Sequence, residues 1–168
     1  MIAHVLIFPS CEGLKGGNFV KYRTLLSVIT GKLSVNLSLK VGGSKGDDVL
    51  IAVFYDDATD TSAVCPYRVK SLNAKIDETT GVKGRCSYSD TCIPLDCYAL
   101  GDVIKAEPLG TFRSNNVTSL LLLDIKDDNI LIVGTKTGDI RKIVLRGDGI
   151  TQTVNKMEAS GDYNSVLC

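Results

Sequence analysis

Apolar and polar residues alternate, or apolar residues form short runs, along most of the chain. Residues 33–41 alternate strictly between the two kinds, which predicts a half-buried strand. The apolar run at residues 49–55 is uninterrupted and of strand length, so we expect a strand buried on both faces. Residues 62–69 predict another strand, in which Pro66 favours an edge or bulge position. This part of the pattern is typical of a mainly β protein.

The segments around these strands are of mixed type. Apolar residues recur at helical spacing in residues 70–77, which predicts one short helix. Residues 19–30 mix aromatic and β-branched residues and fit either a strand or a helix. Residues 13–18 are rich in glycine and predict a loop, and residues 79–100 are rich in turn-forming residues. A short strand is expected at residues 5–8, before Pro9.

The last third of the chain predicts a meander of four short strands. They are expected at residues 117–125, 129–135, 140–145 and 150–154, and Gly138 can adopt the positive φ of a tight turn. A four-stranded antiparallel sheet of roughly 40–45 residues is the unit of a β-propeller blade. An immunoglobulin-like sandwich predicts similar strands but typically packs a Trp against a disulfide, and this chain has no Trp.

Composition narrows the functional classes. The chain has 168 residues, with 19 Lys and Arg against 19 Asp and Glu, so no basic excess favours nucleic acid. His4 is the only histidine, which excludes any site that needs two imidazoles and disfavours an enzyme. The apolar start lacks the pattern of a signal peptide, and the longest later apolar run, residues 120–123, is far short of the roughly 18 residues of a membrane span. We expect no enzyme activity, no cofactor and no transmembrane segment.

The cysteines and two glycosylation sequons favour an oxidising compartment instead. Asn36-Leu37-Ser38 and Asn116-Val117-Thr118 are N-glycosylation sequons, which matter only in the secretory pathway. The six cysteines contain no C-x-x-C pair, so their spacing favours disulfides over a metal site, with buried free thiols as the alternative. Six cysteines allow 15 connectivities. The cysteines are Cys11, Cys65, Cys86, Cys92, Cys97 and Cys168.

Three further groups of residues have an ordinary explanation that we prefer to a functional one. An acidic loop could hold Ca²⁺ but lacks the glycine and distal Glu of a calcium loop, so we expect solvated turn residues. A basic hairpin could meet an acidic partner or a glycan, but its side chains fit the water-facing side of an outer strand. An early glycine cluster lacks the spacing of a phosphate-binding loop. These groups are Asp56, Asp57 and Asp60; Lys136, Arg141, Lys142 and Arg146; and Gly13, Gly16 and Gly17.

Two ordered motifs resemble the sema domain. Residues 46–54 (GDDVLIAVF) and 60–73 (DTSAVCPYRVKSLN) resemble a strand pair of that family that leads to a helical extrusion between blades. Residues 133–143 (VGTKTGDIRKI) resemble the hairpin of a later blade, and residues 108–110 (PLG) point to plexins in particular. The resemblance runs from about Pro9 to residue 145 and implies an all-β fold: part of a seven-bladed β-propeller, with about two complete blades plus flanking strands and a short helical extrusion.

The resemblance also implies pairings for the cysteines. Cys11 and Cys65 match one family disulfide, which would close a loop of 54 residues and stabilise the fold by about 4 kcal/mol in the chain-entropy model. Cys86 and Cys92 match a second pair, although the loop between them is shorter here. Cys97 resembles a cysteine whose partner would lie upstream of this chain, which suggests that the chain is a fragment.

The domain layout that follows is a single partial sema domain over residues 1–168. Residues 1–78 would supply the strands of one blade and the extrusion helix, residues 79–110 a cysteine-containing loop, and residues 111–160 the following blade. Cys168 matches nothing firmly.

The resemblance implies a role in protein–protein recognition. The chain would be part of a plexin-like receptor for a semaphorin-type protein ligand, on the extracellular face of the plasma membrane, with no interface residues assigned. The alternatives within the fold are a semaphorin ligand and a receptor of the hepatocyte growth factor type. The alternative from another class is an intracellular β-propeller scaffold with reduced thiols.

Overall fold

The computed structural model describes residues 5–6, 9–15, 17–81, 99–100, 104–113, 116–146 and 149–156. Thirteen strands and two helices occur in this part of the chain. The helices are α1 (Val35–Val41) and α2 (Val69–Gly81). The strands are β1 (Val5–Leu6), β2 (Pro9–Lys15), β3 (Asn18–Tyr22), β4 (Thr24–Lys32), β5 (Asp48–Asp56), β6 (Thr61–Arg68), β7 (Ala99–Leu100), β8 (Ile104–Ala106), β9 (Gly110–Phe112), β10 (Val117–Ile125), β11 (Asp128–Thr135), β12 (Asp139–Arg146) and β13 (Gly149–Lys156).

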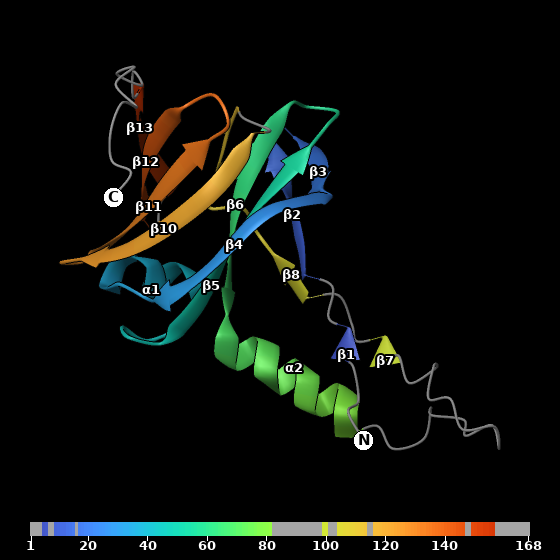
Figure 1. Ribbon diagram of the computed structural model, residues 1–168. Coiled ribbons are helices and arrows are strands. Elements are labelled where there is room, and N and C mark those ends of the chain that lie inside the picture. The colour runs from blue at the N-terminus through green and yellow to red at the C-terminus, as the bar shows by residue number, and fades with distance from the viewer. Residues whose placement is uncertain are drawn as a thin grey trace, which may run out of the picture.

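Three sheets lie one beside the next, and Figure 1 shows the β4–β5–β6 sheet between the other two. The central sheet has the order β4-β5-β6-β9 and is antiparallel throughout. On one side lies the antiparallel meander β10-β11-β12-β13, and on the other the smaller sheet β3-β2-β8, in which β8 runs parallel to β2. Two four-stranded antiparallel sheets with packed faces make an all-β fold like part of a propeller, as expected.

The central strand β5 is buried on both faces, which confirms the prediction from its continuous apolar run. Val49, Ile51 and Val53 are fully buried toward the β10–β13 sheet. Ala52 and Phe54 alternate with them and are buried toward the β3-β2-β8 sheet. The alternation of side chains along a strand thus places one strand in two cores.

Pro66 occupies an edge position of β6, also as predicted. The Val64 carbonyl accepts a hydrogen bond from the backbone N–H of Leu109, so alternate residues of β6 from Val64 onward turn their main chain away from β5. β9 pairs only with Ser62–Val64, and Pro66 lies beyond it. A proline costs no ladder hydrogen bond at such a position, because it has no N–H to donate.

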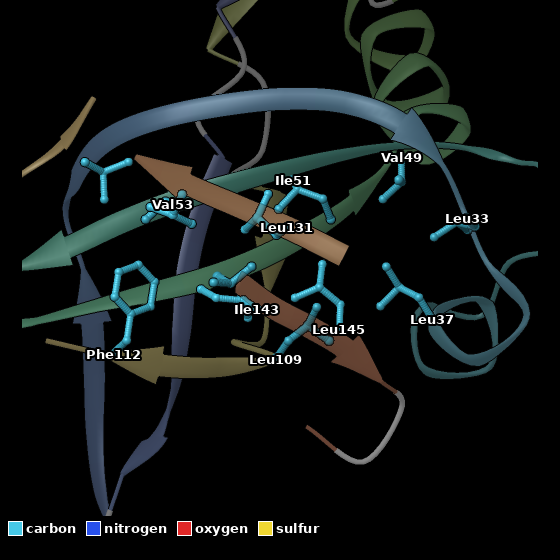
Figure 2. Packing of buried hydrophobic residues seen from close by; sticks show 13 residues of the cluster. Leu33, Leu37, Val49, Ile51, Val53, Leu109, Phe112, Leu131, Ile143 and Leu145 are labelled. Carbon is cyan, nitrogen blue, oxygen red and sulfur yellow. The ribbon is translucent and has the colours of Figure 1, made fainter. Parts of the chain in front are cut away.

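The larger core lies between the central sheet and the meander (Figure 2). Ile51 and Val53 from β5 meet Leu131 from β11 and Ile143 from β12, and all four side chains are fully buried. Leu37 from α1 closes one end of this core. Burial of each such side chain contributes about 1.5–3 kcal/mol relative to leaving it in water.

Residues 33–41 do not form the half-buried strand that their alternation predicts, and this prediction is wrong. They form the short helix α1 instead, which begins after the N-cap Ser34 and ends at Gly42. The Ser34 hydroxyl accepts a hydrogen bond from the Leu37 N–H, and Gly42 adopts the left-handed φ of 70° that favours glycine. Apolar residues four apart lie on one face of a helix, so the period-two pattern also satisfied a helix.

Helix α2 confirms the predicted helix but extends from Val69 to Gly81, beyond the expected residues 70–77. Its place in the topology differs from the expectation. The chain leaves the central sheet after β6, forms α2 and β8, and returns as β9 to the edge of the same sheet. The excursion therefore lies within one sheet and not between two.

Two boundaries of the expected layout change accordingly. β9 (Gly110–Phe112) belongs to the central sheet, so the following sheet does not begin at residue 111. Residues 1–78 contribute to two sheets rather than one, because β2 and β3 pair with β8 while β4 to β6 form the central sheet.

The remaining elements follow the sequence with small changes. Residues 19–30 are strands, which settles the strand-or-helix alternative, while the loop expected at residues 13–18 is mostly strand with a turn at Gly17. The four-stranded meander is confirmed, with Gly138 at φ 80° in its third turn region. Among the described residues, no helix has the length and apolar character needed to cross a membrane.

Candidate functional site

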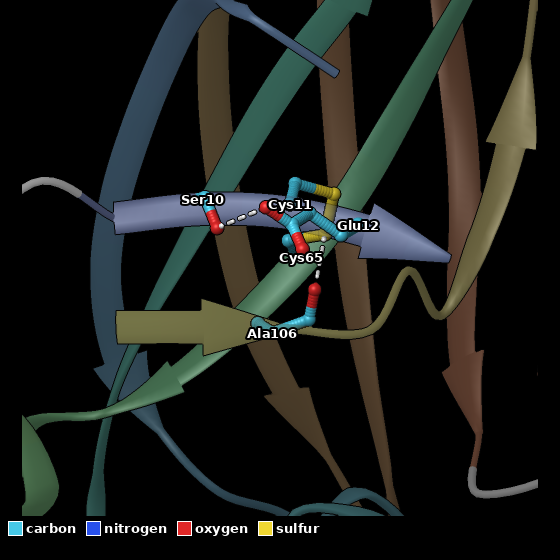
Figure 3. The surroundings of a disulfide bond; sticks show 5 residues. All are labelled: Ser10, Cys11, Glu12, Cys65 and Ala106. Atoms are coloured by element: carbon cyan, nitrogen blue, oxygen red, sulfur yellow. Dashed lines mark hydrogen bonds between the residues drawn. A yellow bond between two sulfur atoms is a disulfide. The ribbon is translucent and has the colours of Figure 1, made fainter. Parts of the chain in front are cut away.

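A disulfide between Cys11 and Cys65 joins two of the three sheets (Figure 3). Cys11 lies in β2, the middle strand of the smaller sheet, opposite Tyr22 of β3 and Ala106 of β8. Cys65 lies in β6 of the central sheet. The two Cα atoms are 6.0 Å apart, and both side chains are fully buried. The pairing that the sema resemblance implied therefore links adjacent sheets.

A small core surrounds this disulfide. Tyr22, Phe54 and Tyr67 pack with Ala52 and Ala63 around the two sulfur atoms. Burial raises the pKa of the Tyr67 phenol, whose hydroxyl has no hydrogen-bond partner in the described part of the chain. This core is rich in aromatic side chains and contains few aliphatic ones, unlike the core on the other face of β5.

The carbonyl of Ala106 lies 3.8 Å from the sulfur of Cys65, as Figure 3 shows. A disulfide sulfur carries no hydrogen, so this approach is a van der Waals contact rather than a donated hydrogen bond. It brings β8 against the covalent link, and the parallel β2–β8 pairing holds it there.

Charged residues lie on the outer face of β2, opposite the disulfide. The Glu12 carboxylate is 3.2 Å from Lys105 Nζ and 3.4 Å from Lys21 Nζ, and it accepts a hydrogen bond from the Ser10 hydroxyl at 3.2 Å. These donors, Lys105 first, hold the pKa of Glu12 below its ordinary value. Since Lys21 is on β3 and Lys105 on β8, the carboxylate joins all three strands of the smaller sheet.

The contact between the central sheet and the meander has a polar seam beside its apolar core. Asn129, at the start of β11, is fully buried. Its Oδ1 accepts a hydrogen bond from the backbone N–H of Ser34 at 2.7 Å, and its Nδ2 donates to the Lys32 carbonyl at 2.8 Å. One buried amide thus satisfies two main-chain groups where the chain passes from β4 into α1.

A second set of contacts extends this seam to the surface. Asn36 Nδ2 donates to Asp128 Oδ1 at 2.7 Å, and the Asn36 backbone N–H donates to the Asp127 carbonyl at 3.0 Å. Arg146 approaches the other oxygen of Asp128 at 3.4 Å. The hydrogen bond from Asn36, followed by that from Arg146, lowers the pKa of Asp128. We use "polar seam" for these contacts of Asn36, Asp127, Asp128 and Arg146 together with those of Asn129.

The two predicted sequons lie at different ends of the meander. Asn36 is in the first turn of α1, and Ser38 of that sequon is buried, with its hydroxyl donating to the Val35 carbonyl at 2.7 Å. Asn116 precedes β10, and Thr118 of its sequon is exposed. The structure does not bring the two sequons together.

The acidic loop residues act within their own turn. Asp56 accepts hydrogen bonds from the backbone N–H and hydroxyl of Thr59, at 3.0 and 2.7 Å, and Asp60 accepts one from the Tyr55 hydroxyl at 2.8 Å. No group of three or more His, Cys, Asp or Glu side chains in the described ranges is arranged to hold a metal ion.

The basic hairpin does not form one surface. The Arg141 guanidinium lies 5.5 Å from the centre of the Phe112 ring, over the interface with the central sheet. Lys142 is the next residue of β12 and is exposed on the opposite face. Arg146 pairs with Asp128 in the polar seam. This dispersal argues against a single acidic-ligand site on these residues.

Sequence analysis missed the polar seam, and four predicted site residues cannot be placed. A signal for the seam existed in Ser34, a typical N-cap residue, but nothing in the sequence links it to Asn129, which is 95 residues away. The predicted Cys86–Cys92 pair, and Cys97 and Cys168, lie outside the described residues.

Comparisons with known proteins point to the plexins. No protein-family model matches the chain. The chain is 27% identical over 169 residues to plexin-A4 of Danio rerio, covering 82% of this chain and 9% of that protein. It is 26% identical over 158 residues to plexin-A4 of Homo sapiens, covering 76% of this chain and 8% of that protein. The chain therefore spans less than a tenth of the length of these relatives.

The fold has a counterpart among solved structures. The full extracellular region of plexin A4 superposes with a TM-score of 0.62 and 21% sequence identity, over 89% of this chain and 19% of that chain. A second structure of the same region gives the same TM-score and identity over 15% of its chain. The all-β, partly propeller-like fold is thus one found in a plexin extracellular region.

Proposed function

We propose that the chain is part of a sema-type β-propeller in a plexin-like cell-surface receptor. In this proposal it acts in protein–protein recognition, with a semaphorin-type protein as the ligand of the complete receptor and no catalytic role. The observation that carries the proposal is the disulfide between Cys11 and Cys65, which links neighbouring antiparallel sheets in a chain similar to plexin-A4. A buried disulfide between sheets is typical of an extracellular domain.

The open faces of the two outer sheets support a place in a larger ring. Leu121 of β10 is 51% exposed on the face of the meander that turns away from the core. Leu14 and Phe19 lie opposite each other on the outer face of the β2–β3 hairpin and are 78% and 66% exposed. Neighbouring sheets of a longer propeller would cover such apolar side chains.

The layout that we propose keeps one partial sema domain over residues 1–168, with one change of boundary. The blade formed by β4, β5, β6 and β9 ends after Phe112, and the following blade begins with β10. The excursion that contains α2 would be the helical extrusion of the family.

The comparisons favour a plexin over the other proteins that share this fold. Both curated relatives are plexins, rather than semaphorin ligands or receptors of the hepatocyte growth factor type. The competing proposal from another class, an intracellular propeller scaffold, requires reduced thiols at Cys11 and Cys65. The redox state of this pair therefore separates the two classes.

The first test asks where the native protein resides and how its cysteines are paired. Cells that make the protein from its own gene are labelled with a membrane-impermeant biotin reagent, and free thiols are blocked before non-reducing peptide mapping. We expect surface-labelled protein with a linked Cys11–Cys65 peptide pair. Unlabelled protein with both thiols free would overturn the proposal in favour of the scaffold.

The second test asks about the ligand. The complete native ectodomain is immobilised, and purified semaphorin ectodomains are passed over it in a surface plasmon resonance experiment. We expect saturable binding by at least one semaphorin, and a large loss of binding when both Cys11 and Cys65 are replaced by Ala. If a disulfide-bonded surface protein binds none of the semaphorins, the fold and location stand but the ligand class is wrong.

A further inference from the structure

We propose that the two sequons have different fates: Asn116 carries an N-linked glycan, and Asn36 remains an unmodified amide. This inference rests on the extracellular placement proposed above, because N-glycosylation occurs only in the secretory pathway. It rests otherwise on the structural contrast between the two asparagines, which the sequence motif cannot reveal.

The side chain of Asn36 is a working part of the polar seam. Its Nδ2 is the atom that a glycan would occupy, and that atom donates to Asp128 Oδ1 at 2.7 Å. Its backbone N–H is held by the Asp127 carbonyl at 3.0 Å. A sugar on Nδ2 would have to share the space between α1 and the β10–β11 turn with the Asp128 carboxylate.

The other two residues of this sequon are buried. Leu37 is fully buried in the larger core, and Ser38 is 6% exposed. The Asn36 sequon is therefore held flat against the interface between the central sheet and the meander. A chain modified at Asn36 could form the seam only by moving α1 away from that core.

The Asn116 sequon lies at the other end of β10 from the turn that contacts α1. The Asn116 carbonyl accepts a hydrogen bond from the backbone N–H of Lys136, a residue of the same sheet. Thr118 is exposed, and its hydroxyl donates to the Gly134 carbonyl at 3.2 Å on the strand beside it. A glycan here would project from one end of the meander and leave the contact between the sheets intact.

The chemical step is an ordinary transfer to an amide nitrogen. The donor is a lipid-linked oligosaccharide diphosphate of the endoplasmic reticulum. The Asn116 Nδ2 forms a bond to the anomeric carbon, the bond between that carbon and the phosphate oxygen breaks, and the lipid diphosphate leaves. The amide nitrogen loses one proton and keeps the other, so no oxidation or reduction is involved.

The test expresses the full chain behind an added cleavable signal peptide, with an extra sequon in a short C-terminal tail as a reporter. Glycosylation of the reporter shows that the chain has entered the secretory pathway. Secreted protein is mapped under non-reducing conditions to select molecules with the Cys11–Cys65 link. Peptide N-glycosidase in heavy-oxygen water then marks each formerly glycosylated asparagine by its conversion to labelled aspartate.

We expect the label at Asn116 and an unlabelled peptide around Asn36 in this selected material. The variant Asn116→Gln should lose the mobility shift of one glycan, whereas Ser38→Ala, which destroys the other sequon, should leave the mobility unchanged. Labelled Asn36 in secreted, disulfide-linked protein would overturn the inference. Unmodified Asn116 in protein whose reporter is glycosylated would also overturn it.

This result does not depend on where the native protein resides, because the signal peptide is supplied. If surface labelling of the native protein fails while Asn116 is glycosylated here, the proposed function is wrong and the structural contrast between the sequons is right. If surface labelling succeeds while Asn36 is the glycosylated residue, the proposed function is retained and this inference is wrong.

Discussion

The central sheet packs against its two neighbours in two different ways. On one side it meets the meander through a core of aliphatic side chains together with the buried amide of Asn129. On the other it meets the β3-β2-β8 sheet through a smaller, more aromatic core and the covalent link between Cys11 and Cys65. The same strand, β5, supplies alternate residues to both cores.

The difference shows how the number of available apolar groups sets the kind of link. The meander presents four complete strands, and its buried Leu and Ile side chains stabilise the contact without a covalent bond. The smaller sheet has three strands, one of only three residues, and buries less aliphatic surface. A disulfide offsets a small core by reducing the conformational freedom of the unfolded chain.

Loss of the disulfide should have the largest effect on this comparison. Replacing both Cys11 and Cys65 with Ala should lower the free energy of unfolding by about 4 kcal/mol, since the link closes a loop of 54 residues. Hydrogen exchange should speed up in β2 and β3 well before it does in β11 and β12. Exchange that rises equally in all sheets would show that the two interfaces do not differ as described.

Truncation of an aliphatic side chain should have the next largest effect, on the opposite interface. Leu131→Ala should cost about 3 kcal/mol, because it removes a fully buried side chain and leaves a cavity. Leu39→Ala on α1 is the matched control, since Leu39 is 78% exposed and should change stability little. Urea unfolding of both variants measures the difference, and equal losses would contradict the assignment of the core.

Removal of the buried amide should cost less than removal of Leu131. Asn129→Ala leaves the Ser34 N–H and the Lys32 carbonyl without their partner, and each buried unpaired group costs about 1–3 kcal/mol unless water replaces the amide. We therefore expect a loss of about 2 kcal/mol and faster hydrogen exchange at Ser34. Asn18→Ala, at an exposed asparagine of β3, is the control, and a similar loss there would contradict the role of the seam.

The strands could be predicted because their patterns are local. The unbroken apolar run of β5 requires burial on both faces, and the turns around β10 to β13 carry their own signals, so both were found correctly. Residues 33–41 were misassigned because apolar residues at every second position also place Leu33 and Leu37 on one helical face. The caps at Ser34 and Gly42 were the deciding signals.

The site was less predictable because it depends on contacts between distant segments. The Cys11–Cys65 pairing followed only from the family resemblance, since six cysteines alone leave many connectivities open. The hydrogen bonds from Asn129 and Asn36 cross to segments about 90 residues away, and no local pattern encodes them. The place of β9 in the central sheet was missed for the same reason.

The smallest expected effect is a dependence of the polar seam on pH. The pKa of Asp128 is lowered in the folded protein by the hydrogen bond from Asn36, so the folded state binds a proton less readily than the unfolded chain. The stabilisation is therefore present above the ordinary pKa of an aspartate, 3.8, and is lost as the pH falls through the lowered value. Asn36→Ala should weaken this loss on the acid side, and Asp128→Asn should remove the contribution of that carboxylate altogether.

Urea unfolding at neutral pH and at several acidic pH values measures this dependence. Glu12 also has a lowered pKa, so the wild-type protein will lose stability in acid from both carboxylates. The difference between wild type and Asp128→Asn isolates the seam, because Glu12 is unchanged in both. An identical acid dependence in the two proteins would mean that the Asn36–Asp128 hydrogen bond does not stabilise the charged carboxylate, and the seam would then rest on the buried amide of Asn129 alone.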